Sequence, residues 1–117
     1  YFPKIYGYIH EAFEDLWELH VGARYYQLLQ DQQIGFPLVH SEVNFKRPLR
    51  FGDRPVVRIS CTHLGYSSLG LRYVFRVLDE VCLEATMTVA CVDLDGLRPR
   101  AVPEEFRSKF ELIMGEV

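Results

Sequence analysis

Cysteine is scarce in this sequence, long hydrophobic runs are missing, and charges of neither sign predominate. The three cysteines, Cys61, Cys82 and Cys91, are an odd number without C-x-x-C spacing, so they predict neither a disulfide framework nor a zinc site. We expect reduced thiols in the core. With 13 basic and 16 acidic residues, the net charge of -3 provides no field that would hold DNA or RNA, and we expect no nucleic acid partner.

Other signals are missing as well. No apolar stretch reaches the about 18 residues that a membrane-spanning helix needs, and the N-terminus has no secretory leader, so we expect a cytoplasmic protein with no membrane partner. The sequence contains neither a G-x-S-x-G motif nor a glycine-rich phosphate loop. His20, His40 and His63 lack the spacing of metal ligands, so we expect no metal and no cofactor.

The composition is that of an ordinary globular domain. The chain has 117 residues, of which 49% are hydrophobic and 25% are charged. Because domains typically contain about 100 to 150 residues, we expect residues 1–117 to form one domain with one core.

The first third of the sequence has helical periodicity. Pro3 suits the first turn of a helix, because that position needs no N–H donor. Glu11 and Asp15 fall on the polar side, and the helix is expected to end near Gly22. The apolar stripe consists of Ile5, Tyr8, Ile9, Ala12, Phe13, Leu16 and Leu19.

Two further helices are expected. The pattern predicts a short helix over Ala23–Gln33 that has Tyr26 on its apolar side and stops at Gly35. Near the end of the chain, Pro103 opens a helix whose apolar side begins at Phe106.

Between these helices the hydrophobic period changes from 3.6 to 2, which predicts strands. Their connections, around Gly52, Gly65 and Asp79, are short and therefore imply antiparallel neighbours along the chain. A long helix and such strands must bury their apolar faces against each other. We therefore expect an α+β fold, a curved antiparallel sheet wrapped around a long central helix. The predicted strands are Leu38–Phe45, Arg54–Leu64, Ser68–Leu78 and Val81–Leu94.

Five short motifs follow one another along nearly the whole chain. They are Tyr1-Phe2-Pro3, Phe36–Glu42, Asn44–Asp53, Leu64–Leu69 and Arg72-Tyr73. In this order and spacing they resemble the hot-dog-fold thioesterases, in particular the 4-hydroxybenzoyl-CoA thioesterase group with the YbgC-type acyl-CoA thioesterases and the 1,4-dihydroxy-2-naphthoyl-CoA hydrolases. The resemblance implies a hot-dog fold and hydrolysis of an acyl-CoA thioester to a free acid and CoA, so that coenzyme A is part of the substrate.

The resemblance also implies a mechanism. An acidic residue, usually Asp, acts as nucleophile or general base, and a helix N-terminus polarises the thioester carbonyl. The backbone N–H groups at Phe2 are then the candidate oxyanion donors, although YbgC-type members have His at this position. The family's Asp, in a segment resembling D-x-x-G-I-V, lies ahead of the position matched by Phe2. We therefore expect the catalytic acid and a first strand on a segment that precedes Tyr1.

Other residues are candidates for contacts to the acyl group. His10 matches a position where relatives place a carboxylate that meets the far end of the acyl group; alternatively, it is a helix histidine at the apolar boundary. Tyr1 and the aromatic residues that follow it would suit an aromatic acyl group, and they would suit a core equally well. Pro37, in the second motif, is included among the substrate-binding candidates.

Two more clusters are candidates for contacts to the rest of the substrate. Lys46 and Arg47 belong to the densest basic cluster and are expected either to hold the CoA phosphates or to protect a strand edge with charge. In the resembling family, the segment that corresponds to Tyr66, Ser67 and Ser68 lies beside the thioester and the pantetheine arm. A simple turn between strands is the alternative interpretation of these three residues.

The open edges of a curved sheet favour a homo-oligomer, either a dimer or a tetramer. In the resembling family the active site lies at the dimer interface. Three alternatives stay open: an acyl-ACP thioesterase, a non-catalytic dimeric module that binds acyl thioesters, and a scaffold unrelated to thioesters.

Overall fold

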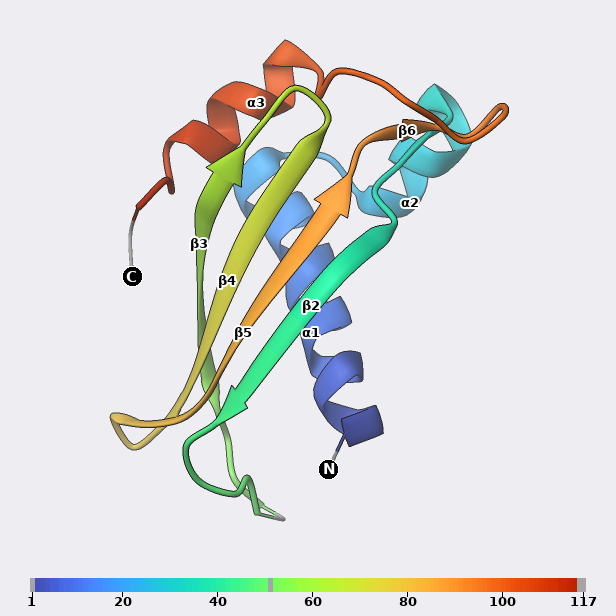
Figure 1. The fold of residues 1–117 in the computed structure, drawn as a ribbon. Helices are drawn as coiled ribbons and strands as arrows, with labels where there is room; N and C mark the ends of the chain where they lie inside the picture. Colours follow the sequence, from blue (N-terminus) through green and yellow to red (C-terminus); the bar gives the residue numbers. More distant parts are fainter. Residues whose placement is uncertain (1, 51, 116–117) are drawn as a thin grey trace.

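One long helix lies across one face of a curved antiparallel sheet (Figure 1). The computed structural model describes residues 2–50 and 52–115, without the side chains of residues 2 and 3, so the predicted contact of Tyr1 lies outside the described residues. The expected α+β architecture is confirmed. The helix is α1 (Phe2–Leu16), and the sheet, in the order β2-β5-β4-β3, consists of β2 (Leu38–Phe45), β3 (Val56–Leu64), β4 (Ser68–Val77) and β5 (Glu80–Ala90).

Shorter elements lie around this pair of layers. Two π-helical segments follow the α-helical ones, a second small sheet has the order β1-β6-β7, and a last helix packs against β3. These elements are η1 (Trp17–Val21), α2 (Tyr25–Gln27), η2 (Leu28–Gln32), β1 (Ile34–Gly35), β6 (Val92–Asp93), β7 (Arg98–Pro99) and α3 (Glu104–Glu111).

The core lies between α1 and the sheet, as the apolar stripe predicts. Each large side chain buried there contributes about 1.5 to 3 kcal/mol from the area removed from water. The cysteines Cys61, Cys82 and Cys91 are buried and free, as expected. The buried side chains that α1 and the two central strands contribute include Ile5, Ile9, Phe13, Leu16, Leu71, Tyr73, Phe75, Leu83, Ala85 and Met87.

The end of the first helix departs from the predicted stripe. Gly22, with a φ of 92°, ends the helix as expected, and its N–H donates to the carbonyl of Trp17 at 2.8 Å. The prediction that Leu19 lies in the core is wrong, because its exposed fraction is 83%. The π-helical turn of η1 contains more residues than an α-turn and therefore rotates the side chains, which places Trp17 and Val21 in the core instead. Tyr8, also predicted in the stripe, is exposed as well.

The second helix differs from the prediction in phase and in its end. Leu28 is buried, whereas Tyr26 is 49% exposed, so its assignment to the apolar side is wrong. The helix ends within the predicted range, but the residue that caps it is Gln33, which has the left-handed φ of 56°, and not Gly35. Gly35 lies in β1 instead, where a Cβ atom would come within 2.9 Å of Cδ2 of Leu94, so a larger residue would have to displace the end of this side chain.

The sheet order also corrects a prediction. The short connection at Gly52 predicts that the first two strands are neighbours, but β2 pairs with β5, and β3 forms the opposite edge. The N–H groups of Lys46 and Arg47 both donate to the carbonyl of Cys82, at 2.7 and 3.0 Å. These bonds keep the chain on β5 beyond the end of β2, and the connection then crosses the end of the sheet (Figure 1).

Two strands are irregular. In the predicted strand Arg54–Leu64, the period of 2 places His63 on the same side as Cys61. The pairing of β3 with β4 shifts between these two residues, so His63 is exposed instead. The last predicted strand, Val81–Leu94, is divided: β5 ends at Ala90, and the Cys91 N–H donates to the carbonyl of Ser67 at 2.6 Å.

Candidate active site

The start of α1 borders a polar cavity. Phe2 is the first residue of α1, and the first turn contains no acidic residue, so the unpaired N–H groups of this turn retain their partial positive charge. The Asp53 carboxylate accepts the backbone N–H of Arg50 at 2.7 Å and shapes the adjacent turn. The side chains of Lys4 and Arg50 also line this cavity beside the helix start. The cavity has a volume of 340 Å³ and is lined by Lys4, Ile5, Tyr8, Leu49, Arg50, Gly52 and Asp53.

A second cavity lies between α1 and the β2 side of the sheet. We call it the aromatic pocket; its volume is 230 Å³. Predicted site residue His10 is part of its wall, with Nε2 3.6 Å from the carboxylate of Glu14 and with most of its side chain exposed. Its lining residues are Tyr6, Ile9, His10, Phe13, Tyr25, Phe36, Leu38, Tyr73, Met87 and Val89.

Phe13, Tyr25 and Phe36 line the aromatic pocket, and their rings pack edge-on or tilted against one another and against Trp17 behind them. The ring centroid of Tyr25 lies 5.0 Å from that of Phe13, and the buried Trp17 ring lies 5.8 Å from Tyr25 and 5.2 Å from Phe36. The hydroxyl oxygen of Tyr25 accepts the backbone N–H of Phe36 at 2.9 Å. Burial raises the pKa of this phenol above its usual value, so it is protonated at neutral pH.

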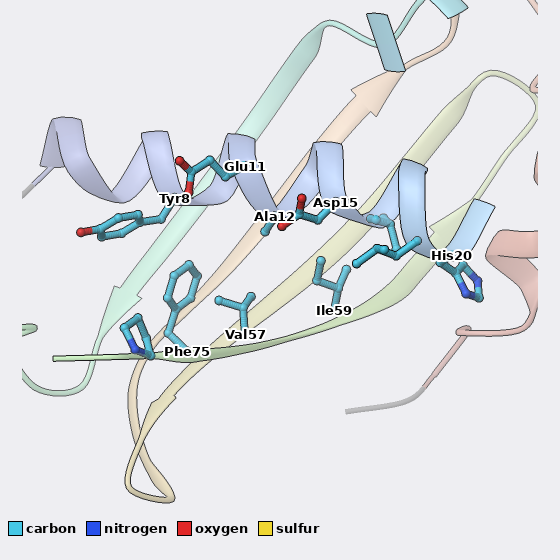
Figure 2. Close-up of a pocket in the computed structure, with 11 residues that line it drawn as sticks. Tyr8, Glu11, Ala12, Asp15, His20, Val57, Ile59 and Phe75 are labelled. Atoms are coloured by element: carbon cyan, nitrogen blue, oxygen red, sulfur yellow. The ribbon is translucent and has the colours of Figure 1, made fainter. Parts of the chain in front are cut away.

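On the other side of α1, an open groove of 610 Å³ runs between the helix and β3. Figure 2 shows Val57, Ile59 and Phe75 pointing from the sheet toward the helix, and Glu11 and Asp15 on the helix. We call this the α1–β3 groove. Both acidic side chains are exposed, as the polar stripe predicts.

The strand that borders this groove has an edge that is only partly covered. The backbone of Cys61 faces away from β4, because its N–H donates to Ile113 at 2.9 Å and its carbonyl accepts from Gly115 at 3.1 Å. Since orientations alternate along an antiparallel ladder, the N–H and carbonyl groups of Val57 and Ile59 also face away from β4. This part of β3 therefore has the geometry to bind a further strand.

The turn between β3 and β4 is held from several sides. The Arg107 guanidinium donates to the carbonyls of Gly65 and Tyr66, at 2.7 and 3.1 Å, and the Ser68 hydroxyl lies 2.8 Å from Nε2 of His63. The carbonyl of Ser67 accepts the Cys91 N–H, as described above. The side chain of Tyr66 is 75% exposed. Within one protomer, this turn and the start of α1 lie at opposite ends of the molecule (Figure 1).

The geometry invites comparison with known proteins. Residues 1–110 match the family described as the thioesterase-like superfamily. This chain belongs to that superfamily. The predicted family and the predicted hot-dog fold are thereby confirmed.

Similar proteins agree with this assignment. The 1,4-dihydroxy-2-naphthoyl-CoA hydrolase of Nostoc punctiforme is 26% identical over 105 residues, which are 90% of this chain and 70% of the relative. The hydrolase of the same name from Rippkaea orientalis is 30% identical over 73 residues, which are 62% of this chain and 52% of the relative. The matched residues therefore span between 52% and 70% of the length of these two relatives.

Solved structures show the same fold. A thioesterase superfamily protein from Jannaschia sp. CCS1 has a TM-score of 0.88 at 23% identity and covers 97% of this chain and 80% of its own. A gentisyl-coenzyme A thioesterase has a TM-score of 0.81 at 26% identity, with 95% of this chain and 84% of that chain covered.

The remaining predicted residues lie apart in this thioesterase-like chain. Lys46 is exposed at the end of β2, at the same end of the molecule as the start of α1 (Figure 1). Arg47 is half-buried, and its Nε lies 2.7 Å from the carboxylate of Glu80 as an ion pair without hydrogen-bond geometry. Pro37 lies next to Leu38 of the aromatic pocket, and its carbonyl accepts the Ala90 N–H at 3.1 Å.

Sequence reasoning did not select Tyr25 and Phe36, which line the aromatic pocket. The aromatic pair Tyr25-Tyr26 was the available signal, but the π-helical turns decide which of the two rings faces inward. Among residues 2–50 and 52–115, no three His, Cys, Asp or Glu side chains form a group suited to a metal ion. None of the helices described over those ranges is long and apolar enough to cross a membrane.

Proposed function

We propose that this chain is the core of an acyl-CoA thioesterase that acts on an aromatic acyl group. The observation that carries the proposal is the aromatic pocket, an apolar cavity lined by rings beside the helix that would polarise the thioester. A cavity of about 150 Å³ binds benzene in another protein, so 230 Å³ offers room for a substituted ring. The names of the relatives, 1,4-dihydroxy-2-naphthoyl-CoA hydrolase and gentisyl-coenzyme A thioesterase, support an aromatic substrate.

In the proposed reaction, the N–H groups at the start of α1 stabilise the oxyanion that forms on the thioester carbonyl. A carboxylate either attacks the carbonyl carbon or takes a proton from the water that attacks it. In the first route the C–S bond breaks to leave a mixed anhydride on the carboxylate, which water then hydrolyses; in the second the C–S bond breaks to give the free acid directly. In both routes a proton from water goes to the departing thiolate, so that CoA leaves as the thiol. One water molecule is consumed.

We place the carboxylate on a segment outside residues 1–117, as the resemblance implies. The α1–β3 groove and the outward-facing backbone of Val57 and Ile59 support a strand bound at that edge. A strand antiparallel to β3 would run toward the end of the sheet where α1 starts (Figure 1). Its last residues would then approach the proposed oxyanion donors.

A homodimer would unite the two parts of the site. The backbones of Ser41 and Val43 face away from β5, because the ladder alternates from the bond between Lys46 and Cys82. When two β2 edges pair antiparallel, the second copy is turned so that its β2 runs in the opposite direction. The end of one copy that contains the β3–β4 turn would then lie next to the end of the other copy where α1 starts.

A cytoplasmic location belongs to the same proposal. Three free, buried thiols fit a reducing compartment. Lys46 is the proposed contact to the CoA phosphates, because its side chain has no partner among the residues that the structure describes.

Thiol release tests the proposal. The full-length protein is incubated at neutral pH with benzoyl-, 4-hydroxybenzoyl-, 1,4-dihydroxy-2-naphthoyl- and long-chain acyl-CoA, and with the same acyl groups on acyl carrier protein. We expect the highest kcat/KM for an aromatic CoA ester. Preference for the carrier-protein esters would identify an acyl-ACP thioesterase, and tight binding without turnover would identify a binding module; either result would overturn the proposal.

A further inference from the structure

Tyr25 has a hydrogen-bond donor that the protein does not use. Its hydroxyl oxygen accepts the Phe36 N–H at 2.9 Å, which leaves the O–H proton available for an acceptor. No acceptor for this proton lies within hydrogen-bond distance in residues 2–50 and 52–115. This hydroxyl is part-buried on a residue that lines the aromatic pocket, so a group that enters the pocket and accepts its proton forms a hydrogen bond that is partly shielded from water.

The surroundings hold this hydroxyl in place. The ring packs edge-on against Phe13, with centroids 5.0 Å apart, and against Trp17 at 5.8 Å. The bond from the Phe36 N–H fixes the oxygen itself, and both Tyr25 and Phe36 line the aromatic pocket. A donor positioned in advance binds an acceptor with little further loss of conformational entropy.

The other polar groups of the pocket are less suited to recognition. The Tyr6 hydroxyl lies 3.3 Å from the Ser41 hydroxyl and is at an exposed position. His10 is mostly exposed and lies beside Glu14. Water competes for both groups, whereas burial of the Tyr25 phenol weakens that competition and raises its pKa, which keeps it a donor.

We propose that the Tyr25 hydroxyl selects aromatic acyl groups that carry an oxygen substituent, by donating a hydrogen bond to that oxygen inside the aromatic pocket. This inference rests on the proposed function. An aryl-CoA ester without such an oxygen leaves the Tyr25 donor unpaired and is therefore the poorer substrate.

The test compares Tyr25→Phe with the unmodified full-length protein. Rates of thiol release are measured with benzoyl-CoA and with its hydroxylated analogues. We expect kcat/KM to fall about tenfold for the preferred hydroxylated ester and to change less than twofold for benzoyl-CoA. Tyr26→Phe, which removes the hydroxyl of the exposed neighbour, is the matched control and is expected to change neither value. An equal loss with both esters would show that the hydroxyl only supports Phe36, and would overturn the inference.

A binding measurement separates this inference from the proposed function. Trp17 is the single tryptophan of residues 1–117 and lies beside Tyr25, so the change in its fluorescence reports occupation of the pocket. We expect hydroxylated benzoates to bind more tightly than benzoate, and Tyr25→Phe to remove the difference. Discrimination without any thioester hydrolysis would refute the hydrolase but support the role of Tyr25. Hydrolysis without any discrimination in either assay would refute the role of Tyr25 alone.

Discussion

The two edges of the main sheet have the same backbone pattern and different surroundings. On β3, the outward-facing N–H and carbonyl groups belong to Val57 and Ile59, and on β2 they belong to Ser41 and Val43. At both edges the side chains of these residues point toward α1. Either edge therefore has the hydrogen-bonding groups to pair with another strand.

The space beneath the edges differs. Beside β3 the groove has 610 Å³ of open volume, whereas beside β2 the helix is already linked to the strand through Tyr6 and Ser41, and the pocket has 230 Å³. A strand added at β3 can bury its own side chains against α1, but one added at β2 can only extend the sheet. Both edges can therefore form backbone hydrogen bonds with a further strand. The volume between the edge and α1 decides whether that strand also packs on the helix, as at β3, or only extends the sheet, as at β2.

The largest expected effect is at the β3 edge. If a strand covers the α1–β3 groove in the full-length protein, Ile59→Asp buries an unpaired charge and lowers the free energy of unfolding by about 3 kcal/mol or more. Urea denaturation of the full-length protein measures this change. Thiol release should fall at least tenfold in parallel, because the proposed acid is on the displaced strand.

The matched control for that variant lies on the same strand. Thr62 is exposed, so Thr62→Asp introduces the same charge at a solvated position, and we expect a change within about 0.5 kcal/mol. Similar, small effects of the two variants would mean that the groove is open to water in solution, and would contradict the proposed strand.

A smaller effect is expected at the β2 edge. The N–H of Val43 faces away from β5, so Val43→Pro retains the ladder within the protomer and removes a donor that a second copy would use. We expect a folded protein whose dimer dissociation constant rises at least tenfold, about 1.4 kcal/mol, as measured by sedimentation equilibrium. Glu42→Pro is the contrasting variant, because its N–H faces β5 and its loss should unfold the sheet. A Val43→Pro protein that dimerises normally would place the interface elsewhere.

The elements of the fold were predictable because they depend on neighbouring residues. The apolar side of α1, the strands and the stop at Gly22 all follow from local periodicity and backbone preference. The sheet order was not predictable. The connection between β2 and β3 is long enough to cross the end of the sheet, so its length does not determine which strands pair. Long-range bonds such as that from the Lys46 N–H to the Cys82 carbonyl determine it instead.

The candidate site was predictable only in part, because local sequence patterns do not determine which distant residues come together. Periodicity and resemblance together selected His10, which lies on the wall of the aromatic pocket, and the start of α1, which borders a polar cavity; their roles stay predictions. The choice between Tyr25 and Tyr26 depends on π-helical turns, which have no signature in the hydrophobic pattern. The separation of the β3–β4 turn from the helix start is a property of the tertiary fold, and motif order along the chain contains no information about it.

The smallest expected effect is on KM, and it concerns Lys46, which follows the end of β2. Lys46 is exposed, whereas Arg47 is half-buried and paired with Glu80, so two adjacent cations predicted to act together have different surroundings. We expect Lys46→Ala to raise KM for a CoA ester about fivefold, near 1 kcal/mol, and to leave the free energy of unfolding unchanged. The same acyl group on N-acetylcysteamine lacks the nucleotide, and its KM should stay constant.

Arg47→Ala supplies the contrast within this pair. It removes the ion pair with Glu80 and the packing of a half-buried side chain, so we expect a lower free energy of unfolding and equal changes of KM for both thioesters. If instead Arg47→Ala raises KM for the CoA ester alone, the guanidinium exchanges Glu80 for a phosphate when substrate binds. The end of the β2 edge would then be a binding surface at both residues, and the contrast between its two cations would disappear.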